Sequence, residues 1–318
     1  MTRGRRRPAR PGRGRLVLLG IAAVSAAVQF APVHPRPFLH FYYLPVVLAA
    51  YSLGLRKGAY AALASCAAVF TIAAASAGRF AAPEAAGWTR WLDLGAWACF
   101  LLVTSLLIGS LSTAKARQVR ELEDAYRGIL DVMSRLIDSV DRYTENHSRR
   151  VAGYAIEVAR QLGLSETEIE DVRVGAVLHD IGKVDISPEV LGKAAGLTPE
   201  EMEEMRDHVD KGERLVRSAG GILRHVLPMV AYHHERWDGT GYKALQGEEI
   251  PLGARIIAVA DTYDAIVTDR AYRKGRTPAE ALAVLREGSG SQFDPLVVEV
   301  FLQLHRAPEQ PAAAEMVA

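Results

Sequence analysis

Cysteine is scarce in this chain of 318 residues, and charged side chains are scarce over its first third. The two cysteines, Cys66 and Cys99, both lie in apolar sequence, so a secreted module built on disulfides is excluded and each is best interpreted as a small buried hydrophobe. Residues 16–111 contain only five basic and two acidic side chains. Because hydrophobic residues make up 49% of the chain and gather in this way, a single soluble globule is also excluded.

The overall net charge of +1 hides a strong division along the chain. Residues 1–15 carry seven Arg and no acid, whereas residues 112–318 carry 26 basic and 35 acidic side chains. The acidic majority of the second part would repel a polyanion. We therefore expect a basic cytoplasmic N-terminus over 1–15 and no polymeric nucleic acid as a partner.

Four apolar stretches follow the basic N-terminus. They run over Leu16–Val33, Pro37–Leu55, Gly58–Gly78 and Leu94–Ala114. Each has close to the roughly 20 residues that cross the hydrocarbon core of a bilayer. The sequence thus predicts a four-helix transmembrane region over 16–114, of which the second span is interrupted by His40 and Pro45.

The basic residues between the apolar stretches predict the orientation in the membrane. The N-terminal arginines, the pair Arg56-Lys57 and the cluster that begins at Lys115 all fall on one side, which the positive-inside rule makes the cytoplasm. The spans contain no carboxylate or Lys that would mark an ion pathway, which argues against transport. We therefore expect a multi-pass protein of the cytoplasmic (inner) membrane whose following domain lies in the cytoplasm.

Residues 115–140 show apolar positions spaced alternately three and four apart. These positions are Val119, Leu122, Tyr126, Ile129, Met133, Leu136 and Val140. Such spacing is typical of a coiled coil, and it predicts a signalling helix that forms a parallel homodimer through residues 119–140. The alternative is a single amphipathic helix packed on its own domain.

The remaining sequence predicts an all-α domain over 141–305, followed by a flexible tail over 306–318. Capping residues stand before prolines in Ser187-Pro188, Thr198-Pro199, Thr277-Pro278 and Asp294-Pro295. Capping boxes join Ser165 to Glu168, Thr198 to Glu201 and Thr277 to Glu280. No strand pattern competes with these helix starts.

Histidines and aspartates of this domain are candidate metal ligands. The candidates are His147, His179, Asp180, His208, His233, His234 and Asp261. Asp180 follows the apolar run 174–178 and Asp261 follows another, so each ionised carboxylate enters a buried site where a cation would offset its desolvation. Imidazole and carboxylate ligands suit Zn, Mn or Fe, and seven exceed what one ion can use. We therefore expect two divalent ions.

These residues stand in motifs that resemble a known family. The motifs are HSRRV from His147, HDIGK from His179, HHERWDGTGY from His233, IPLGARIIAVADTYDAI from Ile250 and QFDP from Gln292. Over residues 141–305 they are similar to the HD-GYP family of the HD-domain metal-dependent phosphohydrolases. The stretch 38–58 resembles, in composition, the membrane sensor regions that precede bacterial signalling domains.

The resemblance implies an all-helical hydrolase that cleaves cyclic di-GMP to the linear dinucleotide, and in some members on to GMP. One metal would be held by His147, His179, Asp180 and Asp261. Asp180 would bridge to a second metal held by His208, His233 and His234. Fe or Mn is favoured for both ions, and Zn is also compatible with these ligands.

Further roles follow from the same resemblance and from the chemistry of phosphodiesters. A hydroxide bridging two metals would attack phosphorus, with Asp180 and Lys183 as the catalytic residues. Lys183 would also contact a phosphate oxygen where charge develops. Arg270 and Arg273 would bind the substrate phosphates, because a guanidinium can donate two hydrogen bonds to one phosphate. Tyr242 would border a guanine or anchor the loop.

Two departures from the family pattern affect these expectations. The family loop reads Gly-Tyr-Pro followed by Gly-Leu, whereas here Gly241-Tyr242 continues into Lys243-Ala244-Leu245, one residue shorter and without the proline. Loss of the proline predicts a looser loop. Tyr143 stands where some members carry a Glu that supports a third metal, which favours a centre of two metals.

The sequence leaves three functions open. The first is a membrane-anchored cyclic di-GMP phosphodiesterase regulated through the membrane region. The second keeps the hydrolysis but acts on another cyclic dinucleotide or a nucleotide phosphate, because the altered loop lies beside the base. The third is a catalytically weak nucleotide receptor or scaffold that signals through partner proteins.

Overall fold

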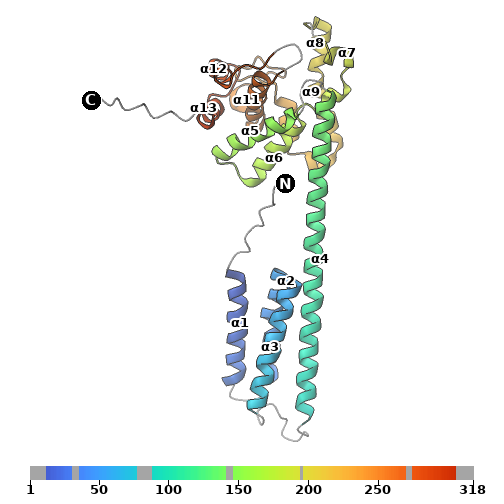
Figure 1. Cartoon of the computed structure of the whole chain (residues 1–318), viewed down its shortest axis with the longest axis vertical. Coiled ribbons are helices and arrows are strands. Elements are labelled where there is room, and N and C mark those ends of the chain that lie inside the picture. The colour runs from blue at the N-terminus through green and yellow to red at the C-terminus, as the bar shows by residue number, and fades with distance from the viewer. Residues whose placement is uncertain are drawn as a thin grey trace, which may run out of the picture. The chain divides into compact units, whose positions relative to one another are not determined.

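The computed structural model describes residues 12–30, 36–76, 88–140, 146–193, 196–269 and 274–305. Within these ranges helix is the regular structure throughout, and the one β-bridge joins Ser289 to Phe293 (Figure 1). The chain divides into two compact units, Met1–Ala125 and Tyr126–Ala318. The expected all-α fold is therefore confirmed for the described part of the chain.

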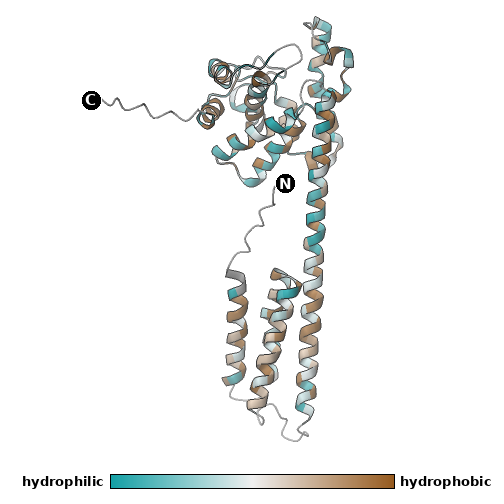
Figure 2. Ribbon diagram, viewed as in Figure 1, coloured by the Kyte–Doolittle hydropathy of each residue, from teal (hydrophilic) through white to brown (hydrophobic). Residues whose placement is uncertain are grey.

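The first unit is built from apolar helices. These are α1 (Gly12–Phe30), the short 3₁₀ helix η1 (Arg36–Tyr42), α2 (Tyr43–Leu53), α3 (Leu55–Ala75) and the first part of α4 (Thr89–Val140). Tyr42, Val69 and Leu101 are fully buried between them. Apolar residues also predominate on the outer faces, which are largely brown in Figure 2, as expected for helices that contact lipid.

Two of these helices are long and apolar enough to cross a membrane, Leu55–Ala75 and Thr89–Val140. The first two expected spans form shorter apolar helices, Arg15–Phe30 and Pro37–Leu53. The second of them changes from 3₁₀ to α-helix at Tyr43, which places Pro45 in the first turn, where a proline is tolerated. The number of spans therefore stays a prediction.

The end of α4 belongs to the core of the second unit. Leu130 and Ile137 are buried there, and Tyr126 and Met133 pack against the same core. Ile129 and Leu136, on another face of the helix, are 60% and 57% exposed. The apolar positions spaced three and four apart thus fall on two faces of α4. One face packs on the chain's own domain, and the other is exposed.

The second unit contains the remaining helices. They are α5 (His147–Gln161), α6 (Glu166–Leu178), η2 (Ile181–Asp185), α7 (Pro188–Leu191), α8 (Pro199–Arg206), α9 (His208–Ser218), η3 (Gly220–Leu223), α10 (Leu227–Tyr232), η4 (Gly247–Glu249), α11 (Leu252–Val267), α12 (Pro278–Glu287) and α13 (Pro295–Leu304). The capping boxes expected before α6, α8 and α12 are all formed.

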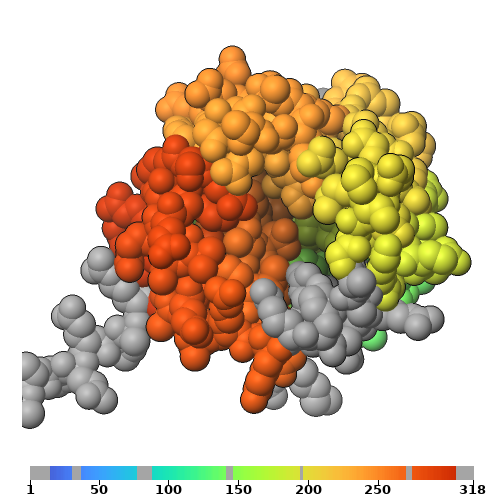
Figure 3. Space-filling model, turned by 90° about the horizontal axis from the view of Figure 1, so that it is seen from above, coloured from blue at the N-terminus to red at the C-terminus, as the bar shows by residue number. Residues whose placement is uncertain are grey.

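The core of this unit lies between α5, α6, α11 and α13. Val151, Leu178, Ile257 and Phe301 are fully buried in it. Several polar residues are equally buried at one end of this core, where α6 ends and α9 begins. Figure 3 shows the surface hollowed between the yellow and the orange segments of the unit.

Candidate metal centre

Three histidines at helix ends have their Nε2 atoms within 4.0 Å of the Asp180 carboxylate. His179 follows α6, His208 is the first residue of α9, and His233 follows α10. The Nδ1 atom of each ring is hydrogen-bonded to a carbonyl oxygen three residues earlier. These oxygens belong to Ala176, Met205 and Val230, at 2.8, 2.6 and 2.9 Å. Because Nδ1 carries the donated proton, each ring in its neutral form presents the lone pair of Nε2.

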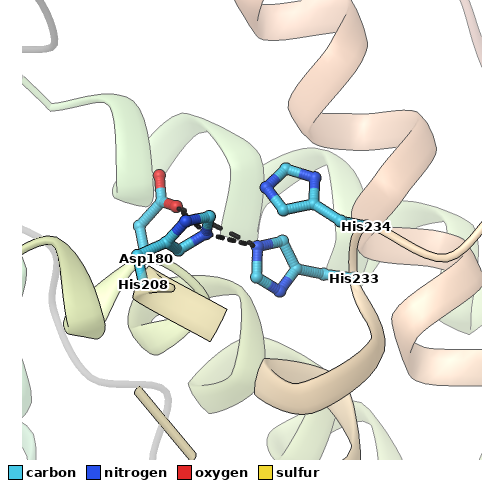
Figure 4. A group of neighbouring side chains, drawn as sticks. All are labelled: Asp180, His208, His233 and His234. Atoms are coloured by element: carbon cyan, nitrogen blue, oxygen red, sulfur yellow. Dashed lines mark hydrogen bonds and ion pairs between the residues drawn. The ribbon is translucent and has the colours of Figure 1, made fainter. Parts of the chain in front are cut away.

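Asp180 is buried, and Figure 4 shows its carboxylate beside the ring of His208. Its Oδ1 is 3.5 Å from Nε2 of His208 and 4.0 Å from Nε2 of His233. Its Oδ2 is 3.2 Å from Nε2 of His179 and 2.8 Å from Nζ of Lys183. The two carboxylate oxygens therefore face two different sets of ligands.

The ligand atoms form two groups that share this carboxylate. One group contains Asp180, His208, His233 and His234, and the other contains His147, His179 and Asp180, with the ligand atoms of each group within 4.8 Å of one another. Asp261 adjoins the second group, because its Oδ1 lies 3.2 Å from Nε2 of His147. The seven expected ligands thus lie close together, six of them in these two groups and Asp261 beside the second.

His147 is oriented by a residue that sequence analysis missed. Its Nδ1 donates a hydrogen bond to Oδ2 of Asp264 at 2.7 Å. Nε and Nη2 of Arg150 donate to the same carboxylate at 2.6 and 2.9 Å, and Asp264 is fully buried. The position of Asp264 one turn after Asp261 on α11 was the available signal, since residues three apart share a helix face.

Charge and burial set the protonation of these groups. Burial, together with the charge of neighbouring histidines, lowers the pKa of His234 to about 4 and lowers the pKa of His233 and His208 as well. These rings are therefore neutral near pH 7, as metal ligation requires. Burial alone would lower the pKa of His147, but Asp261 and Asp264 raise it to about 10.

The donor set fits divalent metal ions. Nε2 of His179 is buried and makes no hydrogen bond within the described residues, although Oδ2 of Asp180 lies near it. Burial opposes ionisation of Asp180, yet the charges of His179 and Lys183 keep its pKa well below the usual value. Asp180 therefore offers buried anionic oxygens beside the imidazole nitrogens of His208 and His233, a combination of ligands that suits Zn, Mn and Fe.

Lys243 and Glu235 hold residues 241–245, called the signature loop below, against α9. Glu235 is buried, and its carboxylate accepts hydrogen bonds from the amides of Lys243 at 2.6 Å and Leu245 at 2.9 Å. Nζ of Lys243 lies 2.9 Å from Asp210 and 2.7 Å from Glu213, both on α9. Sequence analysis predicted a looser loop, but these contacts attach it to the helix that carries His208 without a proline.

We predict that Lys243→Ala lowers kcat/KM for a phosphodiester substrate by about 3- to 10-fold, because partly exposed ion pairs contribute about 1 kcal/mol. The loss should appear mainly in KM and should be less than additive with the loss from Glu213→Gln, since both changes remove the Lys243–Glu213 pair. Lys193→Ala is a matched control, because Lys193 forms a similar pair with Glu201 away from the loop. Equal losses in the two lysine variants would contradict the prediction.

The remaining predicted site residues are placed as follows. The ring of Tyr242 lies 5.0 Å from that of His234, and the guanidinium of Arg206 lies 5.3 Å from the centre of the Tyr242 ring. Lys183 contacts Asp180 from η2. Arg270, Arg273 and Tyr143 lie outside the described residues.

A family model described as HD domain matches residues 131–297. The match covers more than half of the chain, so the chain belongs to the HD-domain family. The matched segment contains the six residues of the two ligand groups and Asp261, and it begins within α4.

Three curated relatives are similar to this part of the chain. The cyclic di-GMP phosphodiesterase of Thermotoga maritima is 38% identical over 188 residues, covering 58% of this chain and 51% of that protein. The cyclic di-GMP phosphodiesterase response regulator RpfG of Xanthomonas campestris is 39% identical over 203 residues, covering 63% of this chain and 54% of that protein. The 3'3'-cGAMP-specific phosphodiesterase 2 of Vibrio cholerae is 34% identical over 185 residues, covering 58% of this chain and 35% of that protein. The chain spans about half the length, or less, of these relatives.

Proposed function

We propose that the protein is a membrane-anchored phosphodiesterase that hydrolyses cyclic di-GMP at a centre of two divalent metals. The observation that carries the proposal is the sharing of Asp180 between two ligand groups, because one bridging carboxylate is what holds two cations close enough to act on one phosphate. The similarity to proteins named cyclic di-GMP phosphodiesterases supports the choice of substrate.

Each of the two ligand groups would hold one metal ion. His147, His179, Asp180 and Asp261 hold one ion, and Asp180 with His208, His233 and His234 holds the other. Two such ions supply Lewis acidity at the phosphate and make a water molecule acidic enough to react near neutral pH. Fe or Mn is the favoured metal, and Zn is also compatible with the ligands.

The chain's own residues bind and orient the substrate. The ammonium of Lys183, which contacts Asp180 at 2.8 Å, is positioned to donate a hydrogen bond to a non-bridging phosphate oxygen as negative charge grows there. Arg270 and Arg273 provide further contacts to the substrate phosphates. Tyr242, beside His234, borders the substrate at the metal centre.

The membrane region anchors and regulates this domain. Two helices with the length and composition of membrane spans, and the apolar helices before them, support four spans with the N-terminus and the catalytic domain in the cytoplasm. The exposed face of α4 that contains Ile129 and Leu136 supports a homodimer through residues 119–140, by which a change in the membrane region would reach the domain. Partner proteins could bind the same assembly.

Two other functions compete with this proposal. Hydrolysis of 3'3'-cGAMP is favoured by the relatives from Vibrio cholerae that carry that name. A catalytically weak nucleotide receptor would use the same ligands without useful turnover. A panel of cyclic dinucleotides separates the two enzymes, and turnover separates both from the receptor.

The first experiment measures metal content and cyclic di-GMP hydrolysis by the full chain, purified in detergent without oxygen and supplied with Mn or Fe. We expect about two metals per chain and a linear dinucleotide or GMP as product. Chelation should remove the activity, and readdition of metal should restore it. Two bound metals without hydrolysis of any cyclic dinucleotide would overturn the phosphodiesterase and favour the receptor.

A further inference from the structure

A pocket lies beside the candidate metal centre, between the α8–α9 junction and the signature loop. Its volume is about 420 Å³, within the range of small-molecule sites, and it extends to His234. The charged and aromatic residues that line it are Glu203, Arg206, Asp207, Arg236, Tyr242 and Lys243. Of these six residues, only Tyr242 has a role in the proposed function.

Arg206 is the cation of this pocket that remains open to a ligand. Lys243 is held by Asp210 and Glu213, and Arg236 is held by Asp238. Arg206 instead lies over the ring of Tyr242 and hydrogen-bonds its hydroxyl, and it forms no ion pair with any carboxylate of the described residues. Its guanidinium has five N–H donors in a planar fork, so several remain for a ligand.

Two carboxylates stand beside this guanidinium. Glu203 and Asp207 are three residues before and one residue after Arg206, they line the same pocket, and neither side chain is bonded to another described residue. Acidic groups next to the open cation disfavour a phosphate here. The pocket instead suits an uncharged planar ring that carries both hydrogen-bond acceptors and donors on its edge.

Resting on the proposed function, we propose that this pocket binds one guanine base of the substrate and that Arg206 determines its selectivity for guanine over adenine. Guanine offers two adjacent acceptors, O6 and N7, to which an arginine can donate two hydrogen bonds. Its N1–H and N2–H₂ donors suit the carboxylates of Glu203 and Asp207. Adenine has a donor, the N6 amino group, where guanine has O6, so the guanidinium would meet it unfavourably.

The location of the pocket agrees with this assignment. It reaches His234, so a base bound there has its own phosphodiester near the metal ligands. The Tyr242 ring lies 5.3 Å from the Arg206 guanidinium and 5.0 Å from the His234 ring, and it forms an aromatic wall of the kind on which bases stack. The attachment of Lys243 to α9 fixes this wall relative to α8 and α9.

The test compares Arg206→Ala with the wild-type full chain on cyclic di-GMP, cyclic di-AMP and bis-p-nitrophenyl phosphate. We expect kcat/KM for cyclic di-GMP to fall about 5- to 150-fold, mainly through KM, which corresponds to the discrimination of one bidentate arginine–guanine contact. The preference for cyclic di-GMP over cyclic di-AMP should fall by the same factor. Hydrolysis of bis-p-nitrophenyl phosphate, which has no purine, should be unchanged because the metal ligands remain.

Arg160→Ala is the matched control, since Arg160 is an exposed arginine at the end of α5 and outside the pocket. It should leave all three activities unchanged. An Arg206→Ala variant that loses activity on all three substrates equally, or that keeps the wild-type preference, would overturn the assignment. Arg206→Lys should not restore the preference, because an ammonium lacks the planar fork.

Binding of GMP and AMP separates this inference from the proposed function. Isothermal titration of the wild-type chain should show tighter binding of GMP, and Arg206→Ala should remove the difference. This result would support the guanine pocket even if cyclic di-GMP were not hydrolysed, in which case only the proposed function would fail. Equal affinity of the wild-type chain for GMP and AMP would overturn the guanine pocket whatever the turnover.

Discussion

Replacement of Asp180 by Ala should remove both metals and lower turnover of cyclic di-GMP by about 1,000-fold or more. The carboxylate is the member common to the two ligand groups, so its loss takes one ligand from each ion at once. The expected factor corresponds to the several kcal/mol of charge stabilisation that metal ions supply at a reacting phosphate. Metal content by mass spectrometry and turnover under anaerobic conditions measure the two effects together.

Asp185→Ala is the matched control for this variant. Asp185 is an exposed aspartate at the end of η2, five residues after Asp180, and the structure gives its side chain no partner among the described residues. Metal content and turnover should stay at the wild-type level. An Asp180→Ala protein that keeps two metals would show that the ligand groups do not share this carboxylate.

Replacement of Gly182 by Ala should separate η2 from α9 and disable the centre. An added Cβ would collide with the carbonyl oxygen of His208 and would stand 2.5 Å from the amide nitrogen of Gly212. These are backbone atoms, so the two segments must move apart, at a cost of about 1–3 kcal/mol. A shift of about 1 Å in His208 relative to Asp180 should lower turnover about 100-fold.

Gly153→Ala provides the opposite case in the same domain. Gly153 lies inside α5, and a Cβ there would meet no other atom within 4 Å. This change should stabilise the fold by about 0.5–1 kcal/mol, because alanine loses less backbone freedom than glycine in a helix. Thermal unfolding of both variants shows whether alanine is harmful only at Gly182, where the backbones approach closely, or at any glycine of the domain. Equal melting temperatures of the two variants would contradict the predicted close approach at Gly182.

Local signals in the sequence were sufficient for the helices of the second unit. The capping boxes at Ser165, Thr198 and Thr277 form as expected because each involves only residues three apart. The motifs also contain the seven candidate ligands, and the structure brings six of them into two groups that share Asp180, with Asp261 beside His147. Their role as ligands stays a prediction.

Contacts between residues far apart in sequence were not predictable in the same way. Asp264 reaches His147 from more than a hundred residues away, and its place one turn after Asp261 makes it a candidate without showing which residue it contacts. The pocket position of Arg206 depends on the folding of the signature loop against α8 and α9. The sequence alone showed the missing proline but not the ion pairs of Lys243.

The end of α4 shows a further limit of periodicity. A spacing of three and four residues reports that a face is apolar, but it does not say what that face contacts. Tyr126 and Met133 pack on the chain's own core, whereas Ile129 and Leu136 remain exposed. Only the packed domain distinguishes these two faces.

The hydrogen bonds that orient the three helix-end histidines have a consequence for folding. Each ring is bonded to a carbonyl oxygen three residues earlier, so its orientation is set as soon as that short segment folds. Bringing α6, α9 and α10 together then restricts few additional rotamers, which lowers the conformational entropy lost in the final assembly. The centre can therefore take shape helix by helix, and Asp180 is added with the same turn that ends α6.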